Sequence, residues 1–111
     1  MDSPAVIVDA LAALAQTHRL GAFRALVAAG PTGVAAGALA ETLALSPSAL
    51  SFHLAHLTRA GLITCRRDGR RLFYAADFAA MAGLVGYLTD NCCGGVPCAA
   101  QPAETPERAA A

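Results

Sequence analysis

LALSPSALSFHLAHLTRAGLITCRRDGRRLFYA, residues 43–75, is the stretch that decides the fold. Ser46-Pro47 combines a helix-capping residue with a proline suited to the first helical position, and Gly61 is favourable just past a helix end. The residues between them therefore predict one helix, to about Ala60. Further on, short segments rich in strand formers flank Asp68-Gly69, a dipeptide typical of two-residue hairpin turns. The stretch predicts a helix followed at once by a β-hairpin.

The flanking sequence adds four more helices. Before the stretch, Ser3-Pro4 opens a helix to about Leu14, and Thr17 can cap a second helix that ends at Gly30-Pro31. PTGVAAG (31–37) has the composition of a loop, and a short helix over 36–43 joins the 47–60 helix through three residues. After the hairpin, Asp77 caps a last helix to about Asn91. This order predicts a mainly α fold, the winged helix-turn-helix, with five helices and a hairpin wing.

Composition excludes several other classes. A chain of 111 residues has room for one domain, and 56% hydrophobic with 14% charged residues is not the composition of a disordered protein. Mean hydropathy is +0.49, yet the longest apolar run, 78–88, is far shorter than the roughly 18–20 residues of a membrane span. The first ten residues lack the basic segment of a signal peptide. We therefore expect a soluble cytoplasmic protein without a membrane partner.

Formal net charge is zero, but the positive charge is unevenly distributed. Five arginines lie between His53 and Tyr74, with Asp68 as the one acid among them. Such a cluster favours a polyanion-binding edge, although a solvated hairpin with arbitrary charges fits the count equally well.

The helix over 47–60 has two different faces. Leu50, Leu54 and Leu57 form one apolar stripe at helical spacing, and the opposite face carries small, polar or basic residues without an acid. That opposite face suits phosphates and base edges. His53 lies beside the stripe, where a partly buried, hydrogen-bonded structural role is favoured over DNA contact. The predicted DNA-contacting residues are Ser46 (mainly a cap), Ser48, Ser51, Phe52, Arg59, Arg66, Arg67, Arg70 and Arg71.

Three of the four cysteines, Cys92, Cys93 and Cys98, gather in NCCGGVPC (91–98). Three thiolates without a fourth local ligand suit a soft three-coordinate ion such as As(III) or Sb(III), whereas zinc usually takes four ligands. A zinc site and a redox or inert role stay open as alternatives. Cys65, on the first wing strand, is expected to be a half-buried strand residue, with an accessory ligand role as the alternative.

The 43–63 segment and the following RRDGRRLFYA closely resemble the helix-turn-helix and wing of ArsR/SmtB-type metalloregulatory repressors, and LAALAQTHRLGAFRAL (11–26) is similar to that family's second helix. The resemblance implies a homodimer, built from the first and last helices, that leaves its operator DNA on sensing a metal or metalloid. The NCC-GG-P-C pattern resembles arsenite-responsive members.

Together these observations predict three segments: a winged helix-turn-helix DNA-binding and dimerisation domain (1–92), a metalloid-binding cysteine segment (92–98) and a disordered tail (99–111). We expect a repressor whose partners are operator DNA and a second copy of the chain. The expected inducer is As(III), with Sb(III) or methylated As(III) as other possible inducers. A thiol-redox-sensing regulator is the alternative. An arsenic-transforming enzyme is disfavoured, since the sequence offers neither a phosphate loop nor a general base beside the thiols.

Overall fold

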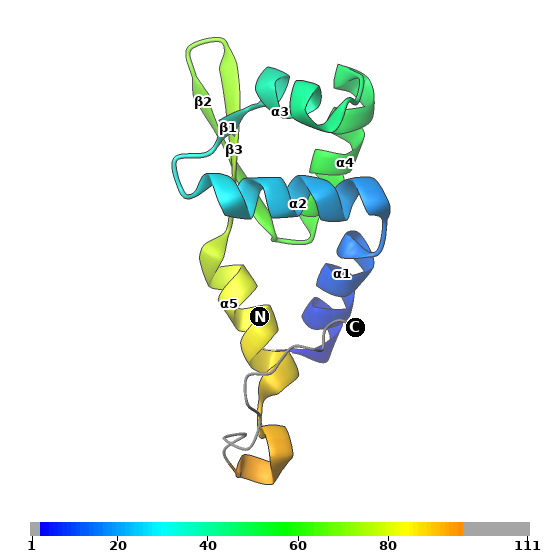
Figure 1. Cartoon of the computed structure of the whole chain (residues 1–111), viewed down its shortest axis with the longest axis vertical. Coiled ribbons are helices and arrows are strands. Elements are labelled where there is room, and N and C mark those ends of the chain that lie inside the picture. Colours follow the sequence, from blue (N-terminus) through cyan, green and yellow to red (C-terminus); the bar gives the residue numbers. More distant parts are fainter. Residues whose placement is uncertain (1–2, 97–111) are drawn as a thin grey trace, which may run out of the picture.

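Five α-helices and a three-stranded antiparallel sheet form the fold in a computed structural model that describes residues 3–96 (Figure 1). The predicted winged helix-turn-helix is confirmed. None of the helices in this part of the chain has the length and apolar content to cross a bilayer. In chain order the elements are α1 Pro4–Leu14, α2 Thr17–Ala29, β1 Val34–Ala35, α3 Ala36–Leu43, α4 Pro47–Arg59, β2 Ile63–Asp68, β3 Arg71–Ala76, α5 Phe78–Thr89 and the 3₁₀ turn η1 Cys92–Gly95.

The helix starts follow their capping residues. Ser46 Oγ accepts a hydrogen bond from the Ala49 N–H at 3.1 Å, and Asp77 Oδ1 accepts one from the Ala80 N–H at 2.9 Å. The predicted Thr17 cap is wrong, because Gln16 takes that place and its Oε1 accepts from the Arg19 N–H at 2.9 Å. Gln16 has the extended backbone of a cap residue, and its longer side chain can still reach the first turn.

The sheet has one strand more than predicted. Residues 31–37 are not all loop, because Val34 and Ala35 form β1 and pair with Tyr74 and Phe73 in the strand order β1-β3-β2. Two residues are too few to show strand periodicity in a sequence. The hairpin turn is also shifted by one position: Asp68 pairs with Arg71, so Gly69 and Arg70 form the loop. Gly69 has φ +65°, as the first loop residue of such hairpins requires.

The core fixes which face of α4 turns outward. Six leucines are fully buried, and they come from α2, α3, α4 and the residue before β2. Three of them are the predicted stripe of Leu50, Leu54 and Leu57. Because this stripe packs inward, the acid-free side of α4 has to face solvent.

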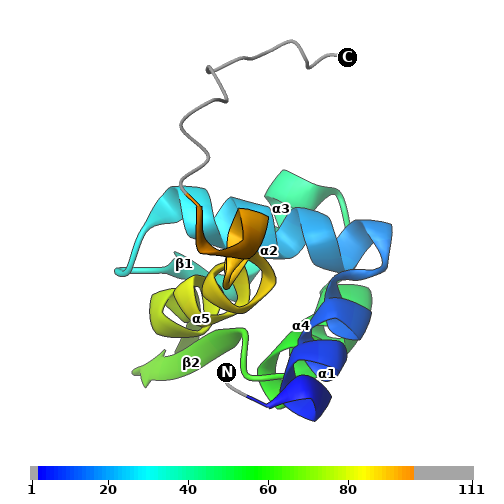
Figure 2. The same ribbon diagram turned by 90° about the horizontal axis from the view of Figure 1, so that it is seen from below.

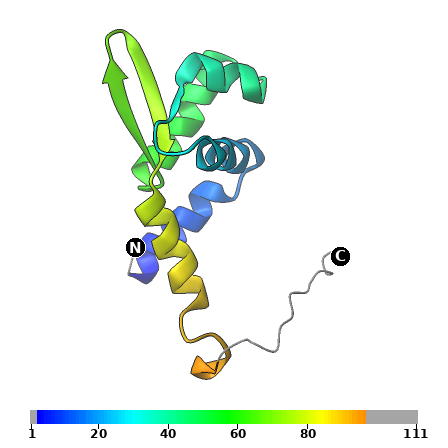
Figure 3. The same cartoon turned by 60° about the vertical axis from the view of Figure 1, so that its left-hand side comes forward.

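The wing and the end of α5 lie at opposite ends of the molecule. Figures 1 and 3 show the β2–β3 hairpin projecting beside α3 and α4, while α5 leads away below α2 and carries η1 at its far end. The view from below in Figure 2 shows α1 and α5 at that second end. The fold thus separates the elements predicted to contact DNA from the predicted thiol site.

Candidate nucleic-acid interface and thiol turn

The outward face of α4 has the composition expected of a surface that meets nucleic acid. Five exposed residues of α4 make up this face: Ser48, Ser51, Phe52, Ala55 and Arg59. Phe52 exposes 61% of its surface, which is a large apolar area to leave in water. Ser46 is mainly a cap, as predicted, and its Oγ also lies 3.4 Å from Ser48 Oγ. The face is therefore polar and basic around one exposed aromatic ring.

The register of the wing leaves two of its arginines in contact with other residues of the chain and two facing solvent. Arg66 and Arg71 lie over the ring of Phe73, with Cζ atoms 4.6 and 5.2 Å from the ring centroid. Arg66 also donates from Nη2 to the Thr32 carbonyl at 2.9 Å, which ties the wing to the chain before β1. Phe73 thus holds two of the wing guanidinium groups against its ring.

Arg67 and Arg70 are the two arginines that face solvent. Both are exposed, and neither makes a hydrogen bond or ion pair with any of residues 3–96. Their guanidinium groups are available to an outside anion, whereas those of Arg66 and Arg71 are partly engaged.

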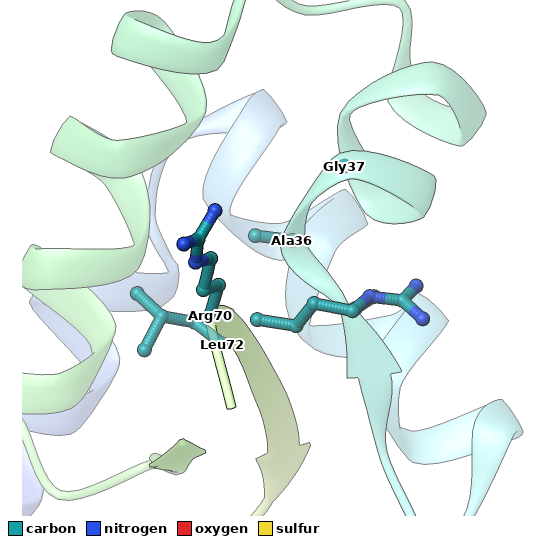
Figure 4. A pocket seen from close by; sticks show the side chains of 6 residues that line it. Ala36, Gly37, Arg70 and Leu72 are labelled. Atoms are coloured by element: carbon teal, nitrogen blue, oxygen red, sulfur yellow. The ribbon is translucent and has the colours of Figure 1, made fainter. Parts of the chain in front are cut away.

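Arg70 and Arg71 meet the first turn of α3 across a cavity of about 350 Å³. Figure 4 shows Arg70 and Leu72 on one side of it and Ala36 and Gly37 on the other. The cap residue of α3 is Ala35, which offers no side-chain hydrogen bond to the helix start. The wing and the first helix of the helix-turn-helix motif therefore face each other, and residues of both also line a second pocket with Pro47 and Ser51 of α4.

The histidine prediction is half right. His53 is partly buried, but its buried Nδ1 has no hydrogen-bond partner in the part of the chain described. Burial, followed by the positive charges of His18 and Arg19, lowers the pKa of His53. His18 comes from α2 and His53 and His56 from α4, so only the packing of these two helices brings the histidines together.

The 3₁₀ turn η1, Cys92–Gly95, follows the end of α5, and we call it the thiol turn. Asn91 and Cys93 adopt left-handed backbone conformations, and the Sγ atoms of Cys92 and Cys93 lie 3.8 Å apart on exposed residues. Cys98, the third predicted ligand, lies outside the described residues. Among residues 3–96 no group of three or more histidine, cysteine or acidic side chains could hold a metal ion.

Cys65 is exposed, so its predicted half-burial is wrong. At the start of β2 only Ile63 is buried, because the rest of the strand projects beyond the helices as an edge of the sheet. Tyr74, opposite Cys65 in the register, has its pKa raised by burial first and then by the neighbouring Cys65 thiol. Within one chain α5 lies between the wing and η1, which separates Cys65 from the thiol turn (Figure 3).

Comparison with known proteins agrees with this geometry. A protein-family sequence model described as a helix-turn-helix domain matches residues 14–66. The nodulation protein NolR of Rhizobium meliloti is 38% identical over 80 residues, which cover 72% of this chain. The match spans 63% of NolR, less than two thirds of its length.

Two solved structures extend the likeness. A possible transcriptional regulator for arsenical resistance is 30% identical, with a TM-score of 0.64, and the match covers 80% of this chain and 97% of that one. The homodimeric winged helix-turn-helix DNA-binding domain of Mb0332 from Mycobacterium bovis, a possible ArsR-family regulator, is 28% identical with a TM-score of 0.61, covering 82% and 84%. The chain belongs to the ArsR family of winged helix-turn-helix transcriptional regulators.

Proposed function

We propose that this chain is a repressor that binds operator DNA as a homodimer and leaves it when As(III), or the similar Sb(III), binds Cys92, Cys93 and Cys98. The observation that carries the metalloid part is the exposed pair of thiols, 3.8 Å apart, at the end of α5. The regulator for arsenical resistance among the similar structures supports the same reading.

DNA recognition is assigned to α4 and the wing. Ser48 and Ser51, on the exposed face of α4, are small hydroxyl donors and acceptors able to approach base edges in a major groove. Arg67 and Arg70 reach phosphates from the wing, while Arg66 keeps the wing in place through Thr32. Base contacts then give sequence preference, and the arginines give affinity.

This division predicts different outcomes for different variants. Arg67→Ala or Arg70→Ala should weaken binding to operator and random duplexes alike and reduce the slope of log K against log [salt] by about 0.9, the value for one phosphate contact. Ser51→Ala should instead narrow the difference between operator and random DNA. Fluorescence anisotropy at several salt concentrations measures both quantities. An unchanged slope in both arginine variants would remove the wing from the contact surface.

The thiol pair fits a soft ion. Thiolates lie about 2.3 Å from a zinc ion, so two thiolates that share the ion at a tetrahedral angle are about 3.8 Å apart. The 3.8 Å between Cys92 and Cys93 meets that condition without rearrangement. As(III) prefers thiolate ligands, and Cys98 is five residues beyond Cys93, past the two glycines Gly94 and Gly95.

Dimerisation links the two functions. α1 and α5 lie at the end of the molecule away from the wing (Figures 1 and 2). Both helices expose large apolar side chains. The large apolar residues that these helices expose are Val6, Val8, Leu11, Val85, Tyr87 and Leu88. A second copy packed on this surface would place two α4 helices on neighbouring half-sites, as in homodimeric regulators of this fold.

Because η1 lies far from α4, an ion bound there cannot block DNA directly. Gathering three thiols would instead restrain the end of α5 and shift the two subunits relative to each other. Such coupling is reciprocal, so operator DNA should weaken arsenite binding by the same factor by which arsenite weakens DNA binding.

Arsenite titration of the DNA complex tests the proposal. Wild type should release labelled operator, whereas Cys92→Ser, Cys93→Ser and Cys98→Ser should each bind operator normally and resist release. Cys65→Ser is the matched control and should respond as wild type does. Normal release from all three single variants would contradict the thiol site.

A thiol-redox sensor is the second candidate, because the same contact between Cys92 and Cys93 would favour their joint oxidation. Hydrogen peroxide in place of arsenite separates the two readings. Release by peroxide and not by arsenite would favour the redox sensor.

A further inference from the structure

All three histidines of the chain lie together with two arginines in one band on the surface of α2 and α4. His18 and Arg19 begin α2, His53 and His56 lie on α4, and Arg59 ends α4. The rings of His18 and His53 are 5.4 Å apart between centroids. We call these five residues the histidine band.

The band adjoins the outward face of α4. The exposed ring of Phe52 lies 5.5 Å from the His53 ring and 5.6 Å from the His56 ring. Arg59 belongs both to the band and to that face. The band therefore continues the predicted DNA surface from α4 onto the start of α2.

The geometry concentrates positive charge there. Arg19 is held by its Nε, which donates to the Ala13 carbonyl at 2.6 Å, and its charge acts on both His53 and His56. The other charges that act on these two histidines, from His18, from Arg59 and between the two histidines themselves, are also positive. On α1, Asp9 is the acid that faces the band, across a concavity of about 290 Å³ that His56 and Arg59 also line.

A surface that gathers like charges is unfavourable until an anion lies against it. Desolvation first, and then the neighbouring positive charges, hold the pKa of His53 and of His56 below the usual 6.5, so both are largely neutral at pH 7 in the unbound protein. A phosphate beside the band would reverse this effect, because it favours the protonated imidazole.

We propose that the histidine band binds a backbone phosphate of the DNA flanking α4, and that His56 takes up a proton from solvent as it does so. This inference rests on the proposed DNA-binding function and adds a contact surface to it. Affinity should rise as pH falls through the histidine pKa of the complex and level off below the lower pKa of the unbound protein.

A duplex of random sequence and about 30 base pairs is the probe, because phosphate contacts do not depend on sequence. At constant ionic strength, wild type should bind it more tightly at pH 6.0 than at pH 8.0. The gain should be severalfold, with tenfold as its upper limit, if the phosphate raises one histidine pKa by about one unit. The His18→Gln/His56→Gln double variant should lose most of this gain.

Arg24→Gln is the matched control. Arg24 is an exposed arginine of α2 outside the band, so its variant should keep the full pH dependence. Thermal unfolding of each variant at both pH values checks that the fold is retained.

Two results would contradict phosphate binding by the histidine band and leave the proposed function intact. One is a double variant with the wild-type pH dependence, and the other is a wild type that binds equally well at both pH values. A wild type that binds no duplex at either pH would contradict both.

Discussion

Gly33→Ala should destabilise the folded protein by about 2–6 kcal/mol, the sum expected for backbone strain and overpacking. Gly33 has φ +86°, a conformation that residues with a Cβ rarely adopt. A Cβ built there would lie 2.6 Å from the Tyr74 carbonyl oxygen. That oxygen belongs to the backbone of β3, beside the pairing of Val34 with Tyr74, so it cannot move without disturbing the sheet.

Gly37→Ala is the matched control for urea or thermal unfolding. Gly37 lies in α3, and a Cβ there would meet nothing within 4 Å. Because alanine is the better helix former, this variant should gain about 0.5–1 kcal/mol. If the two variants had equal free energies of unfolding, the close approach of Gly33 to β3 would not restrict the residue at position 33.

Val85→Glu/Leu88→Glu should convert the protein to a monomer and weaken operator binding by about 10²-fold or more, because the two half-sites are then bound independently. Val85 and Leu88 expose 55% and 58% of their surface on α5, which is unusual for two large apolar residues so close together. Two carboxylates buried in a dimer interface would lack partners.

Sedimentation velocity measures the oligomeric state. Leu20→Glu is the control, since Leu20 is also an exposed apolar residue but lies on α2, and this variant should remain a dimer. If the α5 double variant sediments as a dimer, the subunits meet through another surface.

Most of the helical frame could be read from local sequence. Capping at Ser46 and Asp77 depends on hydrogen bonds that span three residues, and the leucine stripe of α4 depends on a period that any stretch of helix displays. These interactions are short in sequence, so the residues themselves determine them. The exposed face of α4 and the closeness of the Cys92 and Cys93 Sγ atoms are likewise set by residues near one another in the sequence.

Tertiary structure decided what depends on distant segments. β1 exists because β3 offers a partner 40 residues later, and the edge position of β2 leaves Cys65 exposed. The separate roles of Arg66 and Arg67 follow from cross-strand register and from Thr32, and the histidine band needs α2 against α4. Neither propensity nor periodicity encodes such long-range pairings, because their free energy arises only after the chain has closed the loops between them.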